Sequence, residues 1–107
     1  MSETQERLMV LDGPDKGRVW NLDTEQKYAI GRTTDNAILL TDKAVSQHHA
    51  VLQFEDGIWF IDDVGSRHGT WVNDIRVEER KPLFHKDTIR LGRSHLAYLE
   101  SAAKEGE

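Results

Sequence analysis

The chain of 107 residues has no cysteine, only two prolines and no long hydrophobic run. The lack of cysteine excludes disulfides, thiolate zinc sites and cysteine nucleophiles. No apolar stretch approaches the roughly 18 residues of a membrane-spanning helix, and the polar residues 1–6 are unlike a signal peptide. We therefore expect a cytoplasmic protein, not bound to membranes, that folds without a metal or other cofactor.

An excess of positive charge is also missing. The chain has 14 Lys and Arg residues against 19 Asp and Glu residues, a net charge of −5, and most of this excess lies at the two ends. The part of the chain between the two ends is therefore nearly neutral. Nucleic-acid binding generally requires a clustered basic face, which this charge balance does not favour. Any anion that the protein recognises must therefore be met by a local cluster of side chains.

Short apolar runs separated by turn-forming residues fill the chain. Asp56-Gly57 separates two such runs and is a strong hairpin signal, because both residues tolerate a positive φ; Asn73-Asp74 is a weaker signal of the same kind. The best helical window, residues 96–104, is short. The pattern predicts an all-β, two-sheet β-sandwich of ten or eleven strands over residues 7–100, with flexible tails at 1–6 and 101–107.

Polar segments next to glycine stand at the predicted strand ends, where a sandwich carries its functional loops. In chain order they are Gly31-Arg32, Ser46-Gln47-His48-His49, Ser66-Arg67-His68-Gly69-Thr70-Trp71-Val72-Asn73 and Asp87-Thr88-Ile89-Arg90-Leu91-Gly92. Together they resemble the ordered motifs of the forkhead-associated (FHA) domain, a phosphothreonine-binding module. The resemblance spans about residues 7–100.

The resemblance implies an eleven-stranded sandwich whose loops at one end bind a phosphothreonine and its C-terminal neighbours, as an adaptor or regulator downstream of a Ser/Thr kinase. It also implies that Arg32 and Ser46 are the primary phosphate ligands, that Gln47 and Arg67 make secondary contacts, and that His68 contacts the peptide. The residues expected to support the site are Gly31, His49, Gly69, Thr70 and Asn73. The planar guanidinium of Arg32 suits bidentate binding of phosphate, and the hydroxyl of Ser46 can donate to another oxygen.

One position departs from the family pattern. His68 stands where the family usually has an asparagine that bonds the peptide backbone. A protonated imidazole donates from both nitrogens. We therefore expect phosphopeptide binding to tighten as the pH falls from about 7.5 to 6.

Other functions are weighed against this interpretation. A phosphate-independent interaction module on the same fold, using a sheet face or an edge, is the main alternative, and Trp71 is a candidate for an exposed position. A hydrolase built on Ser46, His49 and Asp63 is disfavoured, because no nucleophile elbow or oxyanion hole is evident. Metal binding by His48 and His49 is disfavoured as well, since adjacent strand residues point to opposite faces.

The N-terminal segment suggests one further hypothesis. Thr4 lies among Ser2, Glu3, Gln5 and Glu6. If a kinase phosphorylated Thr4, it could occupy the binding site of the same chain or of a neighbouring copy.

Overall fold

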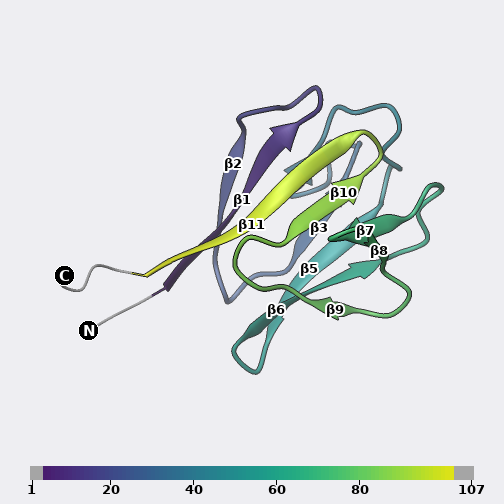
Figure 1. Cartoon of the computed structure of the whole chain (residues 1–107). Coiled ribbons are helices and arrows are strands. Elements are labelled where there is room, and N and C mark those ends of the chain that lie inside the picture. The colour runs from purple at the N-terminus through teal and green to yellow at the C-terminus, as the bar shows by residue number, and fades with distance from the viewer. Residues whose placement is uncertain (1–3, 103–107) are drawn as a thin grey trace.

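The computed structural model describes residues 4–102, which form eleven strands in two sheets and no helix (Figure 1). One sheet has the order β2-β1-β11-β10-β7-β8. Its strands are β1 (Thr4–Asp12), β2 (Val19–Leu22), β7 (Thr70–Val72), β8 (Ile75–Arg76), β10 (Thr88–Leu91) and β11 (Ser94–Ala102). The other has the order β4-β3-β5-β6-β9. Its strands are β3 (Tyr28–Gly31), β4 (Ile38–Leu39), β5 (Ala50–Glu55), β6 (Ile58–Asp63) and β9 (Lys81–Pro82). The predicted all-β sandwich is confirmed.

The core lies between the two sheets and follows the two-residue period of the strands. Leu8 of β1 and Ile89 of β10 face Leu52 of β5 and Trp59 of β6, and each of these side chains is at most 1% exposed. Burying one such side chain contributes about 1.5–3 kcal/mol to folding. The core therefore holds the two sheets in a fixed relation, and no disulfide contributes, because the chain has no cysteine.

Both predicted hairpins are confirmed. Asp56 (φ 53°) and Gly57 (φ 83°) join β5 to β6, and Asn73 (φ 50°) and Asp74 (φ 68°) join β7 to β8. Two successive left-handed residues match the right-handed twist of the flanking strands. Local turn chemistry therefore sets the register of these strands.

The two ends of the chain pair further than the predicted tail boundaries. Thr4 pairs with Ala102 and Glu6 with Glu100, so residues 4–6 and 101–102 belong to the β1–β11 ladder. This part of the ladder consists of backbone hydrogen bonds between mostly polar residues. A hydrophobicity pattern in the sequence does not reveal such pairing. Residues 1–3 and 103–107 lie outside the described residues.

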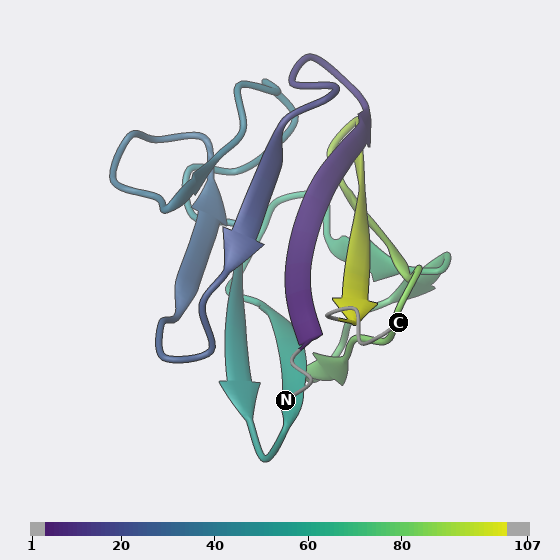
Figure 2. The same cartoon turned by 90° about the vertical axis from the view of Figure 1, so that its left-hand side faces the viewer.

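The loops gather at one end of the sandwich. Figure 2 shows the β1–β2, β3–β4 and β4–β5 loops at the top, whereas the β5–β6 turn and the beginning of β1 lie at the bottom. None of residues 4–102 belongs to a helix that is long and apolar enough to cross a membrane.

Asn73 should stabilise the β7–β8 hairpin through its side chain. Its Nδ2 donates to Asp87 (2.9 Å), and its Oδ1 accepts from the backbone N–H of Thr88 (3.0 Å). Asn73→Gly keeps the positive φ but loses both hydrogen bonds. We therefore expect the free energy of unfolding, measured in urea, to be about 1–1.5 kcal/mol lower than in the wild type. Asn73→Ala should lose about 1 kcal/mol more, because alanine disfavours the left-handed region. Asp74→Gly is the control and should change stability by less than about 0.5 kcal/mol; an Asn73→Gly protein as stable as the wild type would contradict the assignment.

Candidate functional site

A groove of ≈ 370 Å³ lies at the loop end of the sandwich. It contains all of the residues that the sequence analysis expected to contact a phosphopeptide: Arg32, Ser46, Gln47, Arg67 and His68. They come from three separate segments, after β3, between β4 and β5, and between β6 and β7. Four further residues line the groove and were not expected there from the sequence: Lys43, Ala44, Val45 and His48. The groove therefore gathers three permanent cations and two histidines.

Arg32 is held to the β4–β5 loop by two hydrogen bonds. Its backbone N–H donates to the Ser46 carbonyl oxygen (3.1 Å), and its Nε donates to the Val45 carbonyl oxygen (2.9 Å). The terminal Nη atoms have no hydrogen-bond partner within residues 4–102 and can donate to a ligand. The backbone contacts thus orient a guanidinium whose free edge suits a phosphate group.

The hydroxyl of Ser46 joins the two loops that face each other across the groove. Its Oγ accepts a hydrogen bond from the backbone N–H of Arg67 (2.9 Å). A serine hydroxyl can accept and donate at the same time. The proton of Ser46 therefore remains available for an anion in the groove.

The imidazole of His49 connects the same two loops from below. Its Nδ1 accepts from the backbone N–H of Ser46 (3.0 Å), and its Nε2 donates to the carbonyl oxygen of Gly69 (2.9 Å). These partners require the neutral ring with its proton on Nε2. The side chain is fully buried, and burial lowers the pKa of His49 from its ordinary value. His49 thus fixes the distance between the loops and does not face the groove.

Asp63 organises the β6–β7 loop. Its Oδ1 accepts from the backbone N–H groups of Gly65 (2.8 Å) and Ser66 (2.9 Å), and its Oδ2 accepts from the hydroxyls of Ser66 (2.6 Å) and Thr70 (2.7 Å). Burial alone would raise the pKa of Asp63, but hydrogen bonds from Ser66 and Thr70 hold it below its ordinary value. The carboxylate does not bond His49, and the ring bonds the backbone rather than the hydroxyl of Ser46. These contacts do not form a hydrolytic triad.

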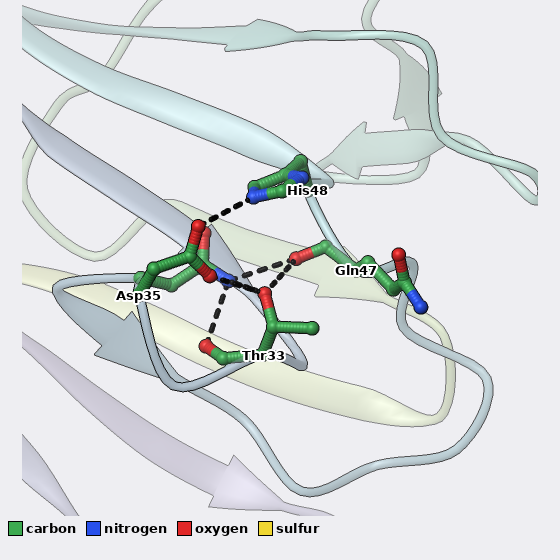
Figure 3. A network of polar contacts seen from close by, with 5 residues as sticks. Thr33, Asp35, Gln47 and His48 are labelled. Atoms are coloured by element: carbon green, nitrogen blue, oxygen red, sulfur yellow. Dashed lines mark hydrogen bonds and ion pairs between the residues drawn. The ribbon is translucent and has the colours of Figure 1, made fainter.

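A second network supports the β3–β4 and β4–β5 loops (Figure 3). The carbonyl oxygen of Gln47 accepts from the buried amide of Asn36 (2.8 Å), and the Gln47 side chain points away from the network. Gly31 lies against the same oxygen: a Cβ at this position would stand only 2.1 Å from it. Any side chain at residue 31 would push the loops apart. The role expected for Gly31 thus has a steric cause.

His48 belongs to the exposed side of this network. Its Nε2 lies 2.9 Å from Asp35 Oδ2. Hydrogen bonds from Thr33 and then from His48 lower the pKa of Asp35 to about 2. His48 and His49 have different partners, and residues 4–102 contain no group of three or more potential metal ligands.

The β4–β5 loop is anchored on its other side by buried Asp42. This carboxylate accepts from the backbone N–H groups of Ala44 (2.9 Å) and Arg93 (2.8 Å) and from the hydroxyl of Ser94 (2.8 Å). A second hollow of ≈ 750 Å³ lies beside this anchor and shares Lys43 and Ala44 with the groove. The role of Asp42 was not predicted from the sequence, although an aspartate that bonds the N–H two residues later is a common turn former.

Not every predicted supporting residue lies at the groove. Gly69 accepts from His49, and Thr70 donates to Asp63, so both support the β6–β7 loop. Asn73 instead forms hydrogen bonds with Asp87 and Thr88, at the beginning of β10. It stabilises a hairpin, and its side chain forms no hydrogen bond with a lining residue among residues 4–102.

Comparisons with known proteins agree on one family. The family model of the FHA domain matches residues 28–92. The glycogen accumulation regulator GarA of Mycolicibacterium smegmatis is 37% identical over 92 residues, which are 86% of this chain and 57% of that protein. The chain thus spans less than two thirds of this curated relative.

Solved structures have the same fold. The FHA domain of Chlamydia trachomatis CT664 superposes with a TM-score of 0.84 at 26% identity, covering 89% of this chain and 96% of that one. An FHA domain studied for its phosphothreonine-dependent interactions gives a TM-score of 0.80 at 30% identity, covering 89% and 95%. The likeness therefore extends over nearly the whole described part of the chain.

Replacing His49 should weaken the fold and remove part of its pH dependence. We expect His49→Ala to lower the free energy of unfolding by about 3 kcal/mol at pH 7.5, because it leaves a cavity and two unpaired backbone groups. Unfolded histidine binds a proton near pH 6.5, whereas folded His49 does so only at lower pH. The free energy of unfolding of the wild type should therefore decrease as the pH is lowered below about 6.5. His49 should account for at most about 1.4 kcal/mol of this decrease per pH unit.

Urea unfolding of both proteins at pH 7.5, 6.5 and 5.5 measures this difference. His48→Ala is the matched control, since it removes an exposed ring and should barely change stability at pH 7.5. Equal slopes in the wild type and His49→Ala would show that His49 is not the neutral connector.

Proposed function

Because the chain belongs to the forkhead-associated family, we propose that its groove binds threonine-phosphorylated segments of partner proteins. The observation that carries this proposal is the meeting of Arg32, Lys43 and Arg67 around the free hydroxyl proton of Ser46. Within residues 4–102, none of these cations has a carboxylate within 4.0 Å. A phosphothreonine brings −1.5 to −2 charges and three acceptor oxygens, which matches this set of donors.

The magnitudes favour the phosphate as the dominant contribution to affinity. A hydrogen bond to a charged group contributes about 1.5–3 kcal/mol, and Arg32 and Ser46 can together supply two or three. The neighbouring hollow, lined by Pro14, Thr41 and Arg93, is suited to receive residues that flank the phosphothreonine. On this proposal the groove recognises the modification, and the hollow contributes to the choice of partner.

The likeness to GarA, whose name describes a regulator of glycogen accumulation, supports a role as a regulator. We propose that the domain acts as an adaptor or regulator and has no catalysis of its own. A Ser/Thr kinase would write the mark, and this domain would recruit or inhibit the protein that carries it. Binding in the cytoplasm remains part of the proposal.

The hypothesis on Thr4 is narrowed by its place in the fold. Thr4 begins β1, and Asp12 ends the same strand next to the binding loops. The rise of a strand separates the two residues by about 26 Å. While β1 stays paired, a phosphorylated Thr4 could therefore reach the groove of a second copy but not its own.

Arg32 should be indispensable for phosphopeptide binding. We expect a degenerate phosphothreonine peptide pool to bind the wild type and its unphosphorylated twin not to bind, with Arg32→Ala weakening binding by about 100-fold. Arg32→Lys should recover only part of the loss, because an ammonium cannot donate bidentately. The exposed Lys27→Ala variant is the control and should bind as the wild type does. Equal binding of both pools, unchanged in Arg32→Ala, would instead favour the phosphate-independent alternative.

His68 should make binding pH-dependent. Between pH 7.5 and 6 the affinity of the wild type, relative to His68→Asn, should rise about two- to fivefold, because a protonated ring places an extra donor and charge beside the phosphate. The second ionisation of the phosphate and the His48–Asp35 pair are common to both proteins and cancel in the ratio. Isothermal titration calorimetry at the two pH values measures the ratio of the wild-type affinity to the His68→Asn affinity. A ratio that does not change with pH would exclude a direct contact by His68.

A further inference from the structure

The outer face of the β2-β1-β11-β10-β7-β8 sheet, which faces the viewer in Figure 1, carries a row of cationic and aromatic side chains. Trp71 of β7 lies opposite Arg76 of β8 on one side and Arg90 of β10 on the other, and Arg90 lies opposite His95 of β11. Residues directly opposite each other on neighbouring strands share a face. We call Arg76, Trp71, Arg90 and His95 the arginine–tryptophan row.

The row points away from the core at the loop end of the sheet. The chain neighbours Thr70, Leu91 and Ser94 are fully buried, so the residues next to them on each strand face outward. β7 begins at Thr70, β10 ends at Leu91 and β11 begins at Ser94. Trp71, Arg90 and His95 are therefore each one residue inside the end of their strand, at the end of the sheet where the binding loops lie.

Arginines flank the ring of Trp71 on both sides. The guanidinium carbon of Arg90 lies 4.7 Å from the ring centroid, and that of Arg76 lies 5.8 Å away. Neither arginine has a carboxylate within 4.0 Å among residues 4–102. The buried indole N–H of Trp71 also has no hydrogen-bond partner in this part of the chain. The ring thus orients two cations that no acid of the described chain neutralises.

The row continues the groove. A Cβ on Gly69 would lie 3.2 Å from the guanidinium carbon of Arg76, so Arg76 packs against the backbone of residue 69. The preceding residue, His68, lines the groove. A chain leaving the groove over His68 therefore passes directly onto the row.

We propose that the arginine–tryptophan row docks an acidic segment of the same phosphoprotein whose phosphothreonine occupies the groove, an inference that rests on the proposed function. Charge complementarity selects this occupant: the row offers two arginines that have no carboxylate within 4.0 Å among residues 4–102. A nucleic acid is disfavoured, because the chain as a whole carries a net charge of −5.

The geometry also sets the spacing of the acidic residues. Arg76 and Arg90 lie on either side of β7, and strands are about 4.8 Å apart, so the two cations are separated by roughly 10 Å. A segment in the polyproline II conformation rises about 3.1 Å per residue with three residues per turn, so side chains three residues apart lie on one face about 9 Å apart. Two carboxylates three residues apart therefore fit the two arginines. Each exposed ion pair is weak, but a tethered segment pairs at a high effective concentration.

The test compares three phosphothreonine peptides by fluorescence anisotropy: a short core, and the same core with two glutamates three residues apart added on its N-terminal or its C-terminal side. We expect one extended peptide to bind the wild type about three- to tenfold tighter than the core does. Arg90→Glu should abolish this gain and bind the core as the wild type does, and Arg90→Gln should lose about half of it. Arg7→Glu, the same charge change in the middle of β1 on this sheet, should keep the gain.

The outcomes separate this inference from the function on which it rests. If the core binds but neither extension improves binding, or if Arg90→Glu and Arg90→Gln both keep the gain, the row is not a docking surface, and the groove proposal stands. If the core itself does not bind, both proposals fail. Binding of a single-stranded oligonucleotide, or a dimer in sedimentation equilibrium, that is lost in Arg90→Gln without any gain from the extensions would assign the row to another partner and overturn the inference.

Discussion

The neutral imidazole of His49 is the constraint on which the candidate site depends. It joins the backbone N–H of Ser46 to the carbonyl oxygen of Gly69, and so spans the two loops that form opposite walls of the groove. A β-sandwich fixes where strands end but not how far apart their loops stand. Because His49 uses the backbone of Ser46, the hydroxyl of Ser46 stays free to face the groove. Burial of the ring keeps it neutral, as this pairing requires.

Hydrogen-bonded carboxylates explain how a protein with a net charge of −5 presents a positive groove. Asp42 and Asp63 each accept several hydrogen bonds from backbone N–H groups and hydroxyls of the loops. Carboxylates engaged in this way organise the loops and are not available to pair with Arg32, Lys43 or Arg67. The acids therefore build the site, and the cations remain for a ligand. Net charge alone could not reveal this division, because it counts both groups together.

The sequence predicted the features that depend on short segments. The Asp56-Gly57 and Asn73-Asp74 turns set two hairpins by local conformation, and the groove residues stand in compact motifs beside strand ends. Features that depend on distant partners were not predictable. Asp42 bonds Ser94, 52 residues away, and the pairing of residues 4–6 with β11 follows from backbone hydrogen bonds alone. Lys43 belongs to no recognisable motif. It lines the groove only because of the path that the β4–β5 loop, which contains it, takes in the folded protein.

On the proposals made above, the groove and the two surfaces beside it have different parts in recognition. Contacts to a phosphate are the same for every phosphorylated partner, so they determine whether binding occurs but cannot distinguish one partner from another. The hollow at Arg93 shares Lys43 and Ala44 with the groove, and the row at Arg90 reaches it through Arg76 and Gly69, so on these proposals both surfaces meet residues that flank the phosphothreonine. Exposed contacts of this kind contribute little individually. On these proposals discrimination arises when both surfaces bind the same segment, and the loops that His49 and Asp42 hold in place keep the two surfaces at a fixed distance from the phosphate contact.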